Sequence, residues 1–190
     1  MKSMAVLLLT YLLLAAGSAE ATDTAALTLD HGISFTLPPG WVLEEKRDTR
    51  KGDNGRLIVE IACETEHCKN DTLETCRVVL FPEHHGDARD AESLEALYAA
   101  PMARYFRMRA VRIATSKDAE FRRLLAPMRI GPRDWYVAET DARHNMKSGL
   151  FADTIIGGWK VQVSCKTCET GEIRHRDAMA MLASFRQDAD

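Results

Sequence analysis

The sequence predicts an α+β fold in which a central antiparallel sheet is flanked by helices. Short segments with alternating apolar and polar residues lie in both the first and the last part of the chain, and turn residues separate them. A helical region in the middle and a closing amphipathic helix stand apart from these strands. Strands joined by short turns favour antiparallel pairing, and segregated helices favour an α+β layer structure.

The N-terminal 21 residues have the pattern of a secretory signal. Lys2 supplies a positive start, residues 4–16 form an apolar run, and residues 19–21 (Ala-Glu-Ala) match a small-residue cleavage site. The apolar run is shorter than the roughly 20 residues of a membrane-spanning helix. We therefore expect cleavage before Thr22, a periplasmic or secreted protein without membrane insertion, and a single domain over residues 22–190.

The first half of this domain is expected to form strands. Residues 26–30 and 33–37 flank a His31-Gly32 turn, and a further strand begins at Trp41 after Pro38-Pro39-Gly40 interrupts the chain. The charged residues 44–55 are expected to form an exposed hairpin connection. Residues 56–63 then alternate apolar with polar, and residues 77–81 form the next strand, which Pro82 should end.

The middle of the chain predicts two helices. Asp90 is a suitable N-cap, and Leu94, Leu97 and Tyr98 follow at helical spacing. Proline is costly inside a helix, so Pro101 predicts a break near Ala100 and a second helix through Met108. The residues expected on the buried side of that second helix are Met102, Tyr105 and Phe106. A short strand is expected at residues 111–114.

The last part of the domain predicts three strands and a helix. The strands are expected at residues 135–139, 150–155 and 159–165, and Gly157-Gly158 predicts a tight turn between the last two. Residues 172–186 form an amphipathic pattern, with apolar residues at i, i+3, i+4 and i+7 from Ala178. His175 is expected to be exposed, because it lies away from that apolar stripe.

The composition gives no sign of catalysis or of nucleic-acid binding. The net charge is −3 and no basic stripe is visible, which argues against nucleic acid and anionic membranes as partners. No nucleophile elbow and no glycine-rich phosphate loop are present. We therefore expect no catalytic residue, no cofactor and no metal, and the oligomeric state is left open.

The cysteines are the strongest candidates for chemistry. All five, Cys63, Cys68, Cys76, Cys165 and Cys168, are disulfide candidates, and an odd number leaves at least one free thiol. The stretch Cys165-Lys-Thr-Cys168 could be a redox centre, half of a zinc site or a structural disulfide. Glu169-Thr170-Gly171 separates it from the last helix, which disfavours a redox thiolate.

A structural role is the favoured interpretation of the cysteines. Cys165 should face the core at a strand end, and Cys168 should lie in the following turn. Their proximity makes Cys165–Cys168 the default pair, although a bridge across the sheet would close a longer loop and stabilise more. Cys63–Cys76 or Cys68–Cys76 would fix the acidic loop at its base. The zinc alternative would recruit Cys63, His67, Cys68 and Cys76 as further ligands.

Two segments are candidate partner-binding sites. The acidic loop (residues 64–75) carries the carboxylates of Glu64, Glu66, Asp71 and Glu74, which could dock a basic partner. The segment Pro82–Asp87 carries His84 and His85. Adjacent side chains on a strand point in opposite directions, so this pair is a poor metal chelate, and a solvated loop is the favoured interpretation.

Several segments together resemble a known family. "ISFTLPPGWV" is similar to the opening of Mog1/PsbP-like domains, with Pro38, Gly40 and Trp41 as the most telling residues. "GPRDWYVAET", "GGWKVQVSC" and "AMAMLASF" are similar to the closing three strands and final helix of that fold. The resemblance implies a central antiparallel sheet between helices and a mostly non-catalytic family. Its members include photosystem subunits, transport accessory factors, effector-chaperone adaptors and exported bacterial proteins of unknown or immunity role.

These observations lead to one hypothesis and two alternatives. The hypothesis is a non-catalytic periplasmic binding protein, specifically an immunity protein that occludes the active site of a type VI secretion toxin. One alternative is a thiol–disulfide or metal-handling protein that uses Cys165 and Cys168. The other is an accessory subunit of an envelope complex.

Overall fold

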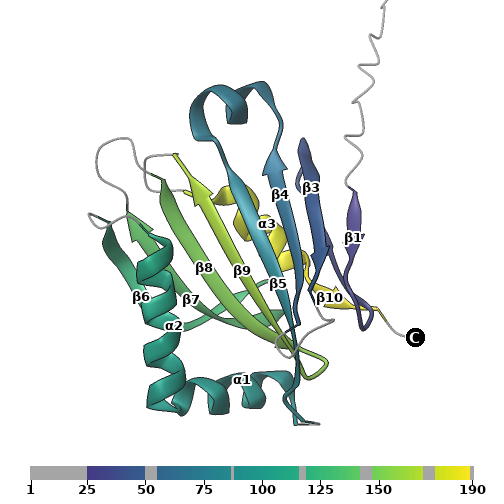
Figure 1. Ribbon diagram of the computed structural model, residues 1–190, viewed down its shortest axis with the longest axis vertical. Helices are drawn as coiled ribbons and strands as arrows, with labels where there is room; N and C mark the ends of the chain where they lie inside the picture. The colour runs from purple at the N-terminus through teal and green to yellow at the C-terminus, as the bar shows by residue number, and fades with distance from the viewer. Residues whose placement is uncertain are drawn as a thin grey trace, which may run out of the picture.

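The computed structural model describes residues 25–49, 55–86, 88–115, 119–141, 147–168 and 174–188. The signal segment predicted for residues 1–21 lies outside these ranges, as do the first residues expected in the last helix. Within the described residues, the chain forms a large antiparallel sheet with few helices, so the α+β prediction is confirmed (Figure 1).

The main sheet has seven strands in the order β3-β4-β5-β9-β8-β7-β6, and every neighbouring pair is antiparallel. Strands consecutive in the chain form every neighbouring pair except β5–β9, which joins the two halves of the sheet at its centre. The strands in chain order are β3 (Trp41–Asp48), β4 (Leu57–Cys63), β5 (Thr75–His84), β6 (Glu120–Ile130), β7 (Arg133–Asp141), β8 (Ser148–Ile156) and β9 (Trp159–Thr167).

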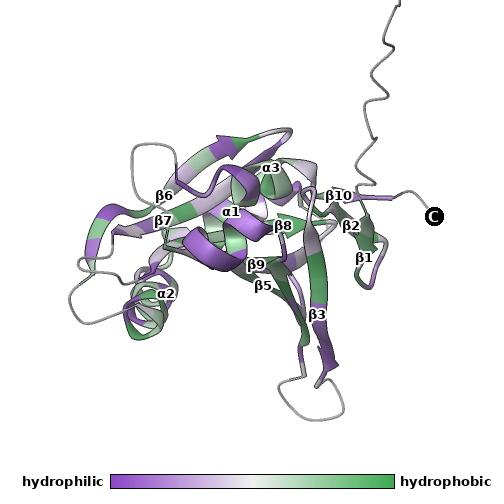
Figure 2. Ribbon diagram, turned by 90° about the horizontal axis from the view of Figure 1, so that it is seen from above, coloured by the Kyte–Doolittle hydropathy of each residue, from purple (hydrophilic) through white to green (hydrophobic). Residues whose placement is uncertain are grey.

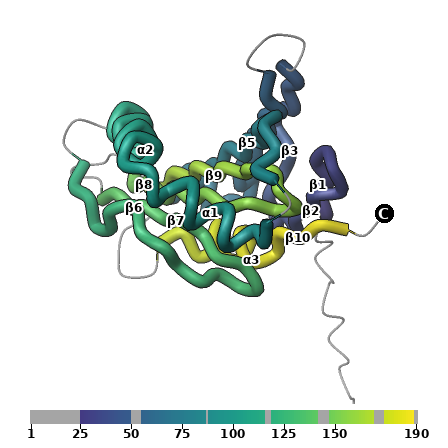
Figure 3. Tube along the Cα trace, turned by 90° about the horizontal axis from the view of Figure 1, so that it is seen from below, coloured from purple at the N-terminus to yellow at the C-terminus, as the bar shows by residue number. Residues whose placement is uncertain are grey.

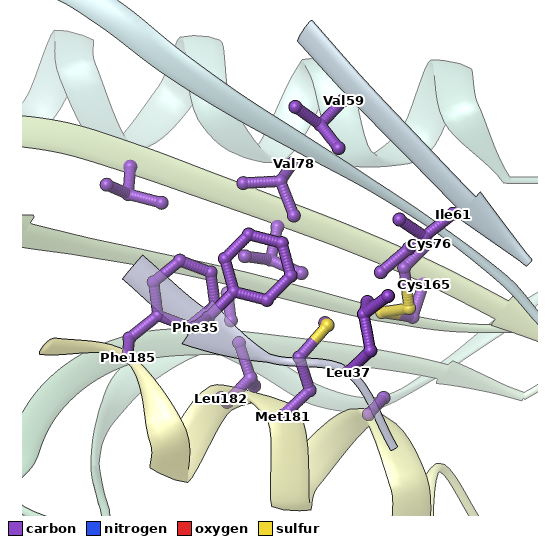
Figure 4. Packing of buried hydrophobic residues seen from close by; sticks show 14 of the residues in the cluster. Phe35, Leu37, Val59, Ile61, Cys76, Val78, Cys165, Met181, Leu182 and Phe185 are labelled. Carbon is purple, nitrogen blue, oxygen red and sulfur yellow. A yellow bond between two sulfur atoms is a disulfide. The ribbon is translucent and has the colours of Figure 1, made fainter. Parts of the chain in front are cut away.

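A small second sheet and the last helix cover one face of the main sheet. β1 (Ala26–Thr28) and β10 (Arg186–Gln187) both pair with β2 (Ile33–Thr36), so the two ends of the domain meet. α3 (Arg176–Ser184) packs beside β2, where Phe35 stacks on Phe185 with ring centroids 4.6 Å apart. Figure 4 shows these rings against the buried side chains of β4, β5 and β9.

The other face of the sheet carries α1 (Asp90–Ala99) and α2 (Pro101–Ala114). Figures 2 and 3 place α2 and α3 on opposite sides of the sheet. Alternate residues of β8 separate the two faces, because Leu150 and Ala152 belong to the α3 cluster while Phe151 and Ile155 pack with α1 and α2. The helices on this second face lie over the β6–β8 half of the sheet.

Many elements lie where the sequence predicts them. The strands predicted at 56–63, 135–139, 150–155 and 159–165 are β4, β7, β8 and β9, each with small differences at its ends. α1 ends at Ala99, and Pro101 opens α2, as expected for a residue without a backbone N–H. Gly157 and Gly158 both have positive φ, which is the conformation that the tight turn requires.

Three local predictions are wrong, and one strand is missed. Residues 44–48 belong to β3 and are not part of a hairpin connection, because β4 pairs with residues 45–48 and Glu44 lies at a shift in the register. β5 continues to His84 through Pro82, past the end of its pairing with β4. Residues 111–114 continue α2 and form no strand. β6 lacks clear alternation, since its pairing with β7 is shifted at two places, and it was not predicted.

No helix among the described residues is both long and apolar enough to cross a membrane.

Candidate functional site

Two disulfides and a free thiol lie together at one end of the sheet. Cys63–Cys68 joins the end of β4 to the short π-helical turn η1 (Cys68–Thr72), with Cα atoms 5.6 Å apart. Cys76–Cys165 joins directly opposite positions of β5 and β9, with Cα atoms 4.0 Å apart. Cys168 is the free cysteine, and its backbone N–H donates to the carbonyl of Thr72 at 2.6 Å.

This arrangement corrects the expected cysteine pairing. Cys165 faces the core and Cys168 follows the strand, as predicted, but Cys165 is bonded to Cys76 and not to Cys168. The register explains the choice, because Cys76 lies opposite both Ile61 and Cys165, whereas Cys63 is two residues further along β4. Disulfide sulfurs are not thiolates, so these four cysteines cannot serve as zinc ligands in this state.

The acidic loop is only partly available to a partner. Glu64 forms an ion pair with Lys69 at 2.7 Å, and Asp71 lies 2.9 Å from the imidazole of His67. Glu66 accepts a 3.4 Å hydrogen bond from the side chain of Asn70. Glu74 is 5% exposed and faces inward. Lys69 therefore offsets one of the four carboxylates of this loop, and local hydrogen bonds or burial engage the other three.

His175 is buried beside Glu74, which contradicts the expectation that it is exposed. It is 4% exposed, and its Nδ1 lies 3.8 Å from Glu74 Oε1. It precedes α3 and has a left-handed backbone conformation, with φ of 57°. The helical spacing of α3 therefore does not predict the direction of its side chain. Burial, assisted by the charge of Arg174, lowers the pKa of His175 to about 4. The imidazole is therefore neutral at pH 7.

His84 and His85 lie at the opposite end of β5 from the acidic loop. His84 meets the ring of Trp159 edge-on at 5.0 Å, and His31 stacks on the same indole at 3.7 Å. His85 donates its backbone N–H to the carbonyl of Gly158 at 2.7 Å. Since ten strand residues span roughly 30 Å, the two predicted partner-binding segments do not form one continuous surface.

A buried charge network, which the sequence analysis did not find, lies between β8 and the helices α1 and α2. Its centre is Asp153, which is fully buried. Arg107 of α2 donates to both carboxylate oxygens, at 2.8 and 2.6 Å. Tyr98 of α1 donates its hydroxyl to the same carboxylate, and Gln162 of β9 donates at 3.2 Å. We call these four residues the Asp153 network.

The Asp153 network serves to hold the helices on the sheet. Four donors reach one carboxylate, whose two oxygens offer about four acceptor positions, so little capacity remains for a metal or substrate. Burial lowers the pKa of Arg107, but the neighbouring charge of Asp153 more than offsets this, so the pKa is raised. Burial and the same negative charge raise the pKa of Tyr98. The guanidinium of Arg107 therefore stays charged, and the phenol of Tyr98 stays protonated, at any physiological pH.

Lys160 lies at the edge of this network, between two aromatic rings. Its Nζ is 5.1 Å from the centroid of Phe81 and 5.6 Å from that of Tyr98. Burial lowers the pKa of Lys160. Aromatic faces attract a cation. The position of the Lys160 ammonium near both rings therefore favours its charged form, which burial disfavours.

α2 meets the sheet through arginines as well as through buried Val111 and partly buried Met108, and it exposes apolar side chains on its other face. Toward the sheet, α2 presents Arg107 to Asp153, and Arg104 donates to the carbonyl of Leu125 at 2.7 Å. Toward solvent it presents four large side chains that are each more than half exposed: Met102 (60%), Tyr105 (57%), Phe106 (55%) and Ile113 (75%). We call these four residues, together with exposed Arg109, the α2 stripe. Figure 2 shows α2 and its hydrophobic residues at the margin of the molecule.

The α2 stripe corrects the prediction that Met102, Tyr105 and Phe106 are buried. The helical spacing of these residues was visible, but spacing alone does not tell which face meets the protein. The sequence feature that could have revealed the stripe is the presence of arginines on the opposite face of the helix. There, Arg104 and Arg107 occupy positions that would otherwise be apolar, and Asp153 interrupts the apolar run of β8.

Among the described residues, no group of three or more His, Cys, Asp or Glu side chains is arranged to hold a metal ion. The cleft of about 360 Å³ between β6, β7 and the start of α3 is bordered by Arg123 and Glu139, which pair with each other at 3.2 Å.

Comparison with known proteins identifies no family. No protein-family model matches the chain, and no curated protein matches it. One similar solved structure is a crystal structure of a protein from Bacteroides thetaiotaomicron, with 11% sequence identity and a TM-score of 0.44. The alignment covers 84% of this chain and 46% of that protein, so this chain spans less than half of its neighbour's length.

Proposed function

We propose that the protein is an exported, non-catalytic module that binds another protein, and that α2 is its binding element. The observation that carries this proposal is the α2 stripe, in which large apolar side chains face solvent on a helix that the Arg107–Asp153 ion pair holds to the sheet. Large apolar side chains that gather on one exposed face are typical of an interaction site. The two disulfides support export, because disulfides persist in oxidising compartments.

A rigid support favours this function. The Asp153 network fixes α2 against β8 and β9, and Cys76–Cys165 covalently ties β9 to β5. A helix that is already positioned loses little conformational entropy on binding, which improves affinity. The narrower proposals are a Mog1/PsbP-like domain and an immunity protein that occludes a toxin's active site. The large antiparallel sheet and the turn at Pro38-Pro39-Gly40 are compatible with the first.

Site-specific photocrosslinking tests the proposal. A benzophenone amino acid replaces Phe106 on α2, Leu73 in the acidic loop, or Glu44 on β3, in the full-length chain expressed in its native cell. We expect a discrete protein adduct from position 106 and none from position 44. Adducts from position 73 alone would place the binding element on the acidic loop, and the absence of adducts at all three positions would contradict a protein-binding function.

The immunity proposal has a separate test against the accessory-subunit alternative. Products of adjacent genes are directed, one at a time, to the compartment that holds this protein, and cell viability is measured. An immunity protein restores viability against one of them, and a Phe106→Ser/Ile113→Ser variant does not. If no adjacent product is toxic but position 106 still crosslinks to an envelope protein, the accessory-subunit alternative is correct.

The thiol–disulfide alternative is disfavoured by the oxidised state of Cys165. A dithiol at residues 165 and 168 would need the Cys76–Cys165 bond to be broken first. Reduction of insulin by the purified protein, or zinc retained after dialysis, would restore this alternative.

A further inference from the structure

We propose that the α2 stripe docks into an apolar groove of a different protein, and that a carboxylate in the middle of that groove pairs with Arg109. This inference rests on the proposed function and names the kind of partner. The mode is helix-in-groove recognition, in which apolar anchors on one helical face enter the partner while a polar residue fixes the register.

The residues of the α2 stripe lie in one row along the helix. Met102, Phe106 and Ile113 lie at i, i+4 and i+11 on one face of the helix, and Arg109 fills the i+7 position between them. Such a row spans about three helical turns, or roughly 16 Å. That length suits a groove on a folded protein.

The arginines of α2 indicate which charge a partner presents. All four charged residues of α2 are arginines, and Arg104 and Arg107 are engaged with the sheet. Arg112 lies over the ring of Phe121, with 4.9 Å from the guanidinium carbon to the ring centroid. Arg109 is exposed and pairs with no group in the described part of the chain. A complementary partner therefore presents negative charge at the centre of an apolar surface.

The position of Arg109 argues against a lipid surface. A helix that lies in a membrane interface places apolar side chains at the centre of the buried face and its cations at the edges. Arg109 instead lies between Phe106 and Ile113, so burying this face in lipid would drag a guanidinium into the apolar layer. A protein groove can supply a carboxylate at that position, and lipid tails cannot.

The same residue argues against a second copy of this chain. A symmetric pair brings the same patch of both copies together. Arg109 lies near the middle of the α2 stripe, so a two-fold axis there would place the two Arg109 side chains within about one helical turn of each other. Like charges at that separation repel, and no acidic residue of α2 relieves them.

Substitution of Arg109 tests the partner's chemistry. The photoadduct at position 106 identifies the partner, which is then purified, and its affinity is measured by titration calorimetry for the full mature chain. We expect Arg109→Leu to weaken binding by at least about tenfold, because it leaves a buried carboxylate unpaired. Arg109→Glu should weaken it further, and Arg109→Lys should retain most of the affinity. The matched control is Arg89→Leu, which removes an exposed arginine of the α1 N-terminus.

Arg109→Leu separates the alternatives because it makes the stripe uniformly apolar. Unchanged or tighter binding to the captured partner would overturn the acidic groove while leaving the proposed function standing. Cosedimentation of the wild-type protein with phosphatidylcholine–phosphatidylglycerol vesicles, strengthened by Arg109→Leu, would assign the stripe to a membrane. A dimer in sedimentation equilibrium that Phe106→Ser dissociates would assign it to a second copy. No protein adduct at position 106 would overturn the assignment of α2 as the binding element, and the absence of adducts at positions 73 and 44 as well would overturn the proposed function itself.

Discussion

At the scale of single residues, Asp153 decides how one face of the sheet is built. It is a carboxylate at a fully buried position of β8, flanked by Ala152 and Thr154, which are also buried. An isolated buried charge is costly, so the fold brings Arg107 of α2, with Tyr98 and Gln162, to this position. The need to neutralise one side chain thereby fixes the orientation of a whole helix.

We predict that Asp153→Ala lowers the free energy of unfolding by about 3–5 kcal/mol, because it leaves the buried guanidinium of Arg107 unpaired. The double variant Arg107→Met/Asp153→Leu removes both charges and should cost clearly less than the single substitution. Urea denaturation followed by circular dichroism measures both. A cost below about 1 kcal/mol for Asp153→Ala would mean that the pair is hydrated.

His175 predicts a stability that depends on pH. Its pKa is about 4 in the folded protein, against 6.5 when unperturbed, so the unfolded chain binds the extra proton between these values. Stability should therefore be complete above about pH 6.5 and should fall as the pH drops toward 4. Between pH 7 and pH 5, the contribution of His175 to the free energy of unfolding should fall by about 2 kcal/mol.

The variant His175→Asn isolates this contribution. Asparagine tolerates the left-handed backbone at this position and does not titrate. The stability of wild type and variant is compared by urea denaturation at pH 7 and pH 5, and the carboxylates cancel in the difference. If the two proteins lose the same stability on acidification, His175 is not responsible.

At the scale of elements, α2 contacts the sheet largely through the polar side chains of Arg104 and Arg107, and it exposes large apolar side chains to solvent. Its one fully buried apolar residue is Val111, whereas Phe106 and Ile113 face solvent. Apolar residues at helical spacing could be recognised in the sequence, and so could the break at Pro101. The face that meets the sheet could not, because it depends on Asp153, which lies 46 residues after Arg107.

We predict that Phe106→Ser/Ile113→Ser changes the free energy of unfolding by no more than about 0.5 kcal/mol, as is usual for surface substitutions. Val111→Ala on the same helix should cost about 2 kcal/mol, because it removes buried apolar groups. Urea denaturation of the three proteins provides the comparison. A large cost for the serine variant would show that the stripe packs against the protein and is not free for a partner.

At the scale of the whole molecule, one large sheet joins two separate apolar clusters, and the disulfides secure its β4–β5–β9 part. Cys76–Cys165 closes a loop with a sequence separation of 89 residues, whereas Cys63–Cys68 closes one of only 5. A longer loop removes more entropy from the unfolded chain. The two bonds therefore differ in their effect on global stability although both lie at the same end of the sheet.

We predict that Cys76→Ala/Cys165→Ala lowers the free energy of unfolding by about 5 kcal/mol, against about 2 kcal/mol for Cys63→Ala/Cys68→Ala, on the loop-entropy estimate. Urea denaturation without reductant measures both variants. Peptide mapping of the wild-type protein under non-reducing conditions should first find these two pairs, with Cys168 as the free thiol. A Cys165–Cys168 peptide in that map would contradict the pairing.

The sequence by itself determined most of the strands, the break at Pro101, the tight turn at Gly157-Gly158 and the inward position of Cys165. These features depend on local periodicity and on the backbone preferences of proline and glycine, which neighbouring residues set. Only the tertiary structure decided the partner of Cys165, the burial of His175 and the outward face of α2. Each depends on residues distant in the chain, through strand register, a left-handed residue before α3, and a buried carboxylate that has to be neutralised.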